Sequence, residues 1–142
     1  GVGVFVVSQW IMEFILKPVI SFDELKGRIA SNIVYAAQYY GNPLSQENFF
    51  DFSISEKYKE AYQEVSNELR KLASELAGFQ EAHRLLFLFK VRKKAVEFAV
   101  LNLIGLSNSL ICPEKNMEKT IELNEKRKQE ILKALDIQIG DF

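Results

Sequence analysis

The sequence begins with an apolar run, GVGVFVVSQWIMEFILKP, and this run constrains the fold more than any other feature. Glu13 and Lys17 are its only charged residues. A membrane-spanning helix needs about 20 apolar residues to cross about 30 Å of hydrocarbon, and a carboxylate near the bilayer centre costs at least a few kcal/mol. The run is therefore a poor complete span, but it makes a good second half of one.

Three residues near the end of this run would then mark the membrane surface. Trp10 would approach the interface, where indole rings prefer to lie, Glu13 would reach the headgroups, and Lys17 would extend its amine to water. We expect residues upstream of Gly1 to supply the other half of the span. Two alternatives stay open. In the first alternative, the run is a helix buried in its own bundle or in an oligomer, with Gln9, Glu13 and Lys17 as a polar stripe. In the second, it is a helix lying flat in the membrane interface.

The rest of the chain has the periodicity of helices, and strand-like alternation is nearly absent. Pro18 should end or kink the first helix because it lacks an N–H donor, and Ser21 should then cap the next one. Gly41-Asn42-Pro43 should end that second helix. Apolar residues at steps of four and three predict that it has one buried face: Leu25, Ile29, Ile33, Ala36 and Tyr40.

Residues 44–54 are predicted to form a connecting loop, with Phe49, Phe50 and Phe52 tucked beneath it against the core. The next segment, residues 55–79, has the alternating spacing by which long helices pack at a shallow angle, and Gly78 should mark its end. The residues of this heptad seam are Tyr58, Tyr62, Val65, Leu69, Leu72, Leu76 and Phe79.

Two further helices complete the predicted fold. Residues 95–111 are apolar around most of the helix, which is typical of the central helix of a bundle, with Val96, Ala99, Leu103, Leu106 and Leu110 on one side. Residues 114–135 carry both signs of charge and should form an outer helix that makes contact through Met117, Ile121, Ile131 and Leu135.

The predicted fold class is therefore all-α. It is a bundle of four or five helices with an apolar N-terminal helix joined through a Pro kink. Residues 1–20 would be the end of a transmembrane anchor, and residues 21–142 would form a single helical bundle domain.

Composition and residue counts restrict the chemistry. With 48% hydrophobic residues and a formal net charge of −1, the chain should fold and should not bind nucleic acid non-specifically. One His (His83) and one Cys (Cys112) are too few for a zinc or di-iron site within the chain. Cys112, between apolar Ile111 and Pro113, is predicted to be a structural thiol. The glycines are scattered, so no phosphate loop is expected. We expect no cofactor and no enzymatic activity.

Three polar clusters remain. Glu56, Glu60, Glu64 and Glu68 follow one flank of the heptad seam and should be a solvated helix face.

The basic cluster Lys90, Arg92, Lys93 and Lys94 follows LLFLF and has the composition of a segment that contacts anionic lipid. The simpler interpretation, which we favour, is a solvated turn between helices.

Ser107 and Asn108, in a largely apolar helix, are candidates for lining a pocket. The alternative, which we favour, is that small residues beside Gly105 let helices approach closely and return their hydroxyls to the preceding turn.

A family resemblance is carried by four stretches: FILKPVISFDELKGRIASNIVYAAQYYGNP, NELRKLASEL, NLIGLSNSL and the closing KALDI. Together they resemble a group of uncharacterised bacterial proteins that have one N-terminal transmembrane helix, a Pro-containing junction and a small cytosolic helical domain. The chain departs from this group at LLFLFKVRKK, where members have a more polar or Pro-bearing connection. The resemblance implies a location and a topology but no activity.

These observations lead to two functional hypotheses. The first is a non-enzymatic membrane-anchored module that self-associates or docks a helical protein partner, with Lys17, Lys26 and Arg28 favouring a cytoplasmic position for its domain. The second is a sensor or binding domain for a small molecule or an anionic lipid.

Overall fold

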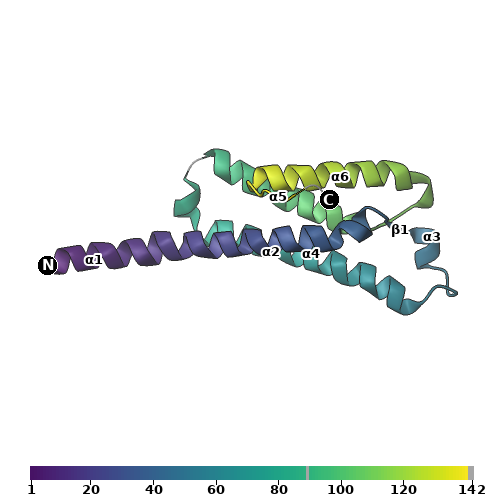
Figure 1. The fold of residues 1–142 in the computed structure, drawn as a ribbon, viewed down its shortest axis with the longest axis horizontal. Coiled ribbons are helices and arrows are strands. Elements are labelled where there is room, and N and C mark those ends of the chain that lie inside the picture. The colour runs from purple at the N-terminus through teal and green to yellow at the C-terminus, as the bar shows by residue number, and fades with distance from the viewer. Residues whose placement is uncertain (89, 141–142) are drawn as a thin grey trace.

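The computed structural model describes residues 1–88 and 90–140, without the side chains of Lys90 and Val91. It confirms the all-α fold class (Figure 1). In chain order the elements are α1 (Val2–Ile11), η1 (Met12–Leu16), α2 (Lys17–Tyr40), β1 (Leu44–Ser45), α3 (Gln46–Phe49), α4 (Glu56–Ala82), η2 (Arg84–Phe87), α5 (Lys90–Asn108), β2 (Ile111–Cys112), η3 (Glu114–Asn116) and α6 (Met117–Ala134).

The first three elements form one continuous helix of 39 residues, Val2–Tyr40, which includes Pro18. Just before the proline, η1 is a π-helix, in which the N–H of Lys17 donates to the carbonyl of Met12 five residues back. This wider turn gives room for the proline ring, which would otherwise clash with the carbonyl four residues earlier. The prediction that Pro18 ends or kinks the first helix is therefore wrong: the hydrogen bonding changes there, and the rod runs on without a sharp bend in Figure 1. The prediction that a new helix begins at Ser21 is wrong, because α2 begins at Lys17.

The bundle consists of α2, α4, α5 and α6. Of these, α2 packs against α4 and α6, and α5 packs against the same two helices. The predicted buried face of α2 is confirmed, with Leu25, Ile29, Ile33, Ala36 and Tyr40 each no more than 3% exposed. The predicted inner side of α5 is also buried, from Val96 to Leu110. However, Phe98 and Leu101 are 46% and 67% exposed, so α5 keeps one open apolar face.

The heptad seam of α4 is buried through its middle, at Tyr62, Val65, Leu69, Leu72 and Leu76, whereas Tyr58 is exposed. The prediction that the helix ends at Gly78 is wrong, because α4 continues to Ala82. A glycine inside a helix weakens it by only about 1 kcal/mol, which the packing of so long a helix easily offsets.

The connection between α2 and α4 differs from its prediction. Phe49 packs against the core, but Phe50 and Phe52 are 73% and 99% exposed, so the prediction that they pin the loop is wrong. The loop is held instead by a short parallel pairing of β1 with β2. Leu44 lies opposite Ile111, and the N–H of Leu44 donates to the carbonyl of Leu110 at 2.8 Å. This pairing joins the two connections at the end of the bundle far from α1 (Figure 1).

Tyr62 ties the end of α2 to α4. Its hydroxyl donates to the backbone carbonyl of Asn42 at 2.7 Å and lies 3.3 Å from the hydroxyl of Tyr58. Burial, followed by the hydrogen bond with Tyr58, raises the pKa of Tyr62 above its ordinary value. The folded protein therefore keeps this proton at a pH at which the unfolded chain has lost it.

Replacing Leu103 with alanine should lower the free energy of unfolding by about 2–5 kcal/mol, because Leu103 is fully buried and the substitution leaves a cavity in the core. The matched control is Leu123→Ala on α6, at a residue that is 42% exposed, which should change stability by no more than about 0.5 kcal/mol. Urea unfolding of the full chain in mild detergent, followed by circular dichroism, measures both. Equal effects would contradict the placement of Leu103 in the core of the bundle.

Stability should fall as the pH rises above about 10, the ordinary pKa of tyrosine, because only the unfolded chain then releases the Tyr62 proton. A Tyr62→Phe variant should lose less stability over this alkaline range than the native chain. Tyr35→Phe, at a residue that is 59% exposed, serves as the control and should follow the native chain. Urea midpoints measured at successive pH values provide the test, and parallel curves for all three proteins would refute it.

Candidate functional site

The N-terminal part of the long helix projects beyond the bundle (Figure 1). Residues 1–17 are all exposed, and Pro18 is the first buried residue of the chain. A surface so rich in large apolar side chains is unfavourable in water and marks a contact surface. Its large apolar residues are Val2, Val4, Phe5, Val6, Val7, Trp10, Ile11, Met12, Phe14, Ile15 and Leu16.

The apolar side chains of α1 surround the helix instead of forming one stripe. A helix on the surface of a water-soluble bundle has an apolar face and a polar face, whereas a helix in lipid is apolar on all sides. Because residues 1–17 are all exposed, the alternative of burial in the chain's own bundle is excluded. Lipid or another polypeptide chain remains as the cover.

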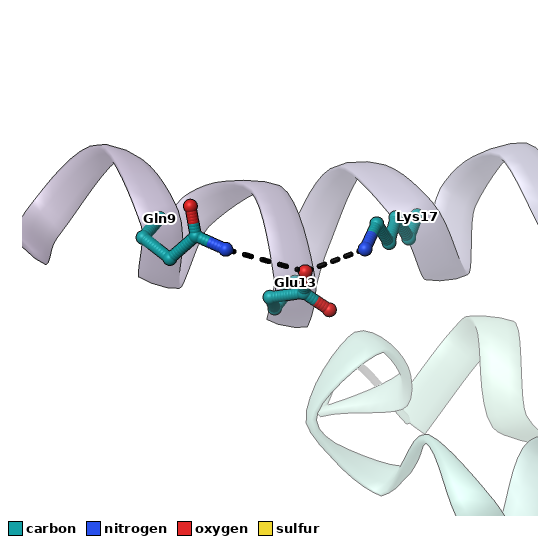
Figure 2. Close-up of polar contacts among 3 residues, drawn as sticks. All are labelled: Gln9, Glu13 and Lys17. Atoms are coloured by element: carbon teal, nitrogen blue, oxygen red, sulfur yellow. Dashed lines mark hydrogen bonds and ion pairs between the residues drawn. The ribbon is translucent and has the colours of Figure 1, made fainter. Parts of the chain in front are cut away.

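Gln9, Glu13 and Lys17 form one polar stripe along this helix, as their spacing predicts (Figure 2). The amine of Lys17 lies 2.5 Å from Oε1 of Glu13, and the amide of Gln9 donates to the same oxygen at 3.4 Å. In water such an ion pair contributes only about 0.3–0.5 kcal/mol. At a membrane surface, however, pairing also reduces the net charge that would have to approach the hydrocarbon.

Trp10 lies on the turn before Glu13 and is 52% exposed. Its ring packs against Phe14 with the ring centroids 5.7 Å apart. The three residues predicted to mark an interface, Trp10, Glu13 and Lys17, therefore occupy two successive turns of an exposed helix. By length and composition, the helix Val2–Tyr40 is able to cross a membrane.

Ser107 and Asn108, the predicted pocket residues, lie on the wall of a cleft of about 640 Å³ between α4 and α5. The hydroxyls of Ser107 and Ser66 are 2.9 Å apart, and each also donates to the other residue's backbone carbonyl, at 3.0 and 3.1 Å. Asn108 accepts a hydrogen bond of 2.8 Å from Arg70. These polar groups are thus engaged in holding α4 to α5.

The prediction that the hydroxyls return to the preceding turn is confirmed only for Ser109, which donates to the carbonyl of Leu106 at 2.9 Å. Ser107 instead bonds across to α4. The close neighbour of Gly105 is a side chain of α6, because a Cβ at this glycine would lie 2.6 Å from Nε of Arg127. The side chain of Arg127, rather than a helix backbone, lies over this glycine. Burial lowers the pKa of the Arg127 guanidinium.

Asn124 is a buried polar residue that the sequence analysis missed. It is 0% exposed, and its amide nitrogen donates to the carbonyl of Tyr40 at 3.1 Å, at the end of α2. Its amide oxygen accepts from the hydroxyl of Ser109 and from Arg127, the latter at 3.3 Å. An asparagine at an inward position of α6 was the available signal. The sequence does not indicate which residues form hydrogen bonds with Asn124.

Three members of the basic cluster, Arg92, Lys93 and Lys94, are exposed, and the side chain of Lys90 lies outside the described residues. Lys93 lies 4.0 Å from Glu97. Arg92 and Lys94 line a groove of about 910 Å³ that extends to Val19, where the long helix meets the bundle. Within the cluster, Lys93 thus lies beside an acidic residue of α5, whereas Arg92 and Lys94 face the groove.

The remaining candidate residues have structural surroundings. Glu56, Glu60, Glu64 and Glu68 are exposed along α4, which confirms the predicted solvated face. Cys112 is buried in β2, and the ring of His83 lies 4.4 Å from that of Phe79. Within the described residues, no group of three or more His, Cys, Asp or Glu side chains is placed to hold a metal ion.

In comparisons with known proteins, no family model matches the chain, and no curated protein or solved structure is detectably similar to it. The resemblance to bacterial proteins with one transmembrane helix is supported at one point, the apolar N-terminal helix that is able to cross a membrane. The class of protein defined by the fold is thus a helical bundle continued into an exposed apolar helix.

Replacing Asn124 with alanine should lower the free energy of unfolding by about 1–3 kcal/mol, because the Tyr40 carbonyl and the Ser109 hydroxyl would lose a buried partner. Asn67→Ala, at an exposed position of α4, is the control and should stay within about 0.5 kcal/mol of the native chain. Thermal unfolding in mild detergent measures both variants. A neutral Asn124→Ala would show that this network does not hold α6 to the end of α2.

Proposed function

We propose that this chain is a membrane-tethered helical module, in which the N-terminal helix enters a bilayer and the bundle binds a second copy or a helical partner protein. The observation that carries the proposal is the exposure of residues 1–17, of which the first seven are apolar on all sides of the helix. Lipid can surround such a helix on all sides, whereas a protein partner would need a complementary apolar surface.

The dimensions of the helix support this arrangement. At 1.5 Å per residue, Val2–Ile11 rises about 15 Å, which is about half of the hydrocarbon thickness of a bilayer. Trp10 would then lie at the interface, and the pair formed by Glu13 and Lys17 would lie among the headgroups.

The flanking charges support a cytoplasmic position for the bundle. Lys17, Lys26 and Arg28 follow the apolar segment, and basic residues within about 15–20 positions of a span favour the cytoplasmic side. Their acidic partners, which include Glu75 at 2.5 Å from Arg28, alter this preference little, because acidic residues contribute little to the rule.

The open face of α5 is the surface we assign to a protein partner. Phe98, Leu101 and Ile104 recur every three residues and are 46%, 67% and 37% exposed. Residues at this spacing share one side of a helix and suit the apolar face of a second helix. A second copy of the chain would present the same stripe, which makes a symmetric pair the simplest assembly.

A second candidate function, binding of a small molecule, is favoured by one observation, the cleft of about 640 Å³ lined by Ser107 and Asn108. It ranks second because Ser107 and Asn108 already bond to Ser66 and Arg70, so a ligand would compete with contacts that hold the bundle together.

Replacing both Phe5 and Val6 with aspartate should release the full chain from membranes, because each carboxylate placed in hydrocarbon costs about 2.5–3.5 kcal/mol. The matched control replaces Phe50 and Phe52 with aspartate, at exposed positions far from α1, and should remain bound. Resistance of cell membranes to alkaline extraction and flotation with liposomes measure both variants. Retention of the Phe5/Val6 variant, or release of the native chain, would contradict the anchor.

The partner surface is tested separately by the mass of the native chain in detergent, determined by light scattering. Leu101→Lys should reduce an oligomer to the monomer, whereas Gln129→Lys, at an exposed position of α6, should not. A monomeric native chain would refute self-association and leave the membrane anchor in place.

A further inference from the structure

The turn between α4 and α5 lies beside the long helix at the level where that helix enters the bundle. A cleft of about 380 Å³ is lined by Glu13, Phe14 and Pro18 from the long helix and by residues 81–86 from the end of α4 and the turn. Figure 1 shows this turn at the end of the bundle from which α1 projects. If Glu13 lies among lipid headgroups, then the turn reaches the same layer.

Two leucines of this turn point away from the core. Leu85 and Leu88 are 65% and 72% exposed, whereas Phe87 between them is 8% exposed. The Phe87 ring packs edge-on against Phe22 at 5.6 Å and against Phe79 at 6.2 Å. The turn is thus held from the inside by Phe87, and this fixes Leu85 and Leu88 on its outer side.

Cations precede and follow these leucines in the chain. Arg84, Arg92 and Lys94 are exposed, and Arg84 pairs with Glu81. Among the described residues, Arg92 and Lys94 have no ion pair within 4.0 Å, although Glu130 and Asp136 line the same groove. Exposed leucines beside unpaired cations are the composition of segments that enter the boundary between headgroups and acyl chains of an anionic membrane.

We propose that the α4–α5 turn is a second membrane contact, in which Leu85 and Leu88 enter the lipid surface while Arg92 and Lys94 bind anionic headgroups. This proposal rests on the proposed membrane anchor, because the long helix sets the depth of the turn. Two points of attachment would hold the bundle against the membrane instead of letting it swing on one helix. Anionic lipid would thus act as a ligand that sets the orientation of the bundle.

The experiment measures the depth of single positions in the full chain. An environment-sensitive fluorophore is attached to Leu88→Cys, Ile11→Cys or Phe52→Cys, each in a Cys112→Ala background, and the proteins are reconstituted into vesicles. The vesicles contain phosphatidylcholine alone or phosphatidylcholine with phosphatidylserine, and a lipid-borne nitroxide quenches fluorophores in the membrane. Circular dichroism confirms that each labelled protein is folded.

The label at position 88 should be quenched strongly on vesicles with phosphatidylserine and weakly on neutral ones. Replacing Arg92 and Lys94 with glutamate should abolish most of this difference, whereas Lys119→Glu and Lys126→Glu on the exposed side of α6 should not. The label at position 52, a residue that is 99% exposed, should be quenched on neither vesicle. The label at position 11 should be quenched on both.

Two results would overturn the proposal without affecting the anchor. One is a label at position 88 that stays unquenched on both vesicles while position 11 is quenched. The other is equal quenching of position 88 on neutral and anionic vesicles, which would refute the recognition of anionic headgroups. An unquenched label at position 11 would overturn the membrane anchor itself, and the second contact with it.

Discussion

The structure depends on the continuity of one helix through a proline. Val2–Tyr40 keeps its helical path because the π-helical turn at Met12–Leu16 shifts the hydrogen bond of Lys17 to Met12 and leaves space for the ring of Pro18. Without that shift, the proline would interrupt the helix where it enters the bundle. The exposed apolar segment and the buried face of α2 are therefore two parts of one rigid rod. A surface that holds the first part therefore also limits how far the bundle lies from that surface.

The bundle end of this rod is secured by apolar packing and by a few polar contacts between helices. Ile29 and Ile33 of α2 are fully buried, and the carbonyl of Tyr40 at the end of α2 accepts the amide of Asn124 from α6. Ser66 and Ser107 join α4 to α5 by reciprocal hydrogen bonds. Such contacts are directional, and they fix which helices are neighbours, whereas apolar burial favours any compact arrangement.

Periodicity predicted the parts of the fold in which local spacing alone decides burial. The buried faces of α2 and α5 follow from steps of three and four, because such steps place side chains on one side of a helix. The loop aromatics Phe50 and Phe52 were misplaced, since hydrophobicity does not indicate whether an irregular segment folds back or projects. The continuation through Gly78 was also missed, because a glycine ends a helix only where no packing supports the next turn.

The sequence by itself determined that the chain is helical, that its first segment is mostly apolar, and that Gln9, Glu13 and Lys17 share one stripe. These properties depend on residues a few positions apart, which helical geometry brings together in any context. Only the tertiary structure decided that residues 1–17 stay outside the bundle, that Ser107 faces Ser66, and that the α4–α5 turn lies beside Glu13 and Pro18. These contacts join residues far apart in the chain, and the packing of whole helices, not local spacing, selects them.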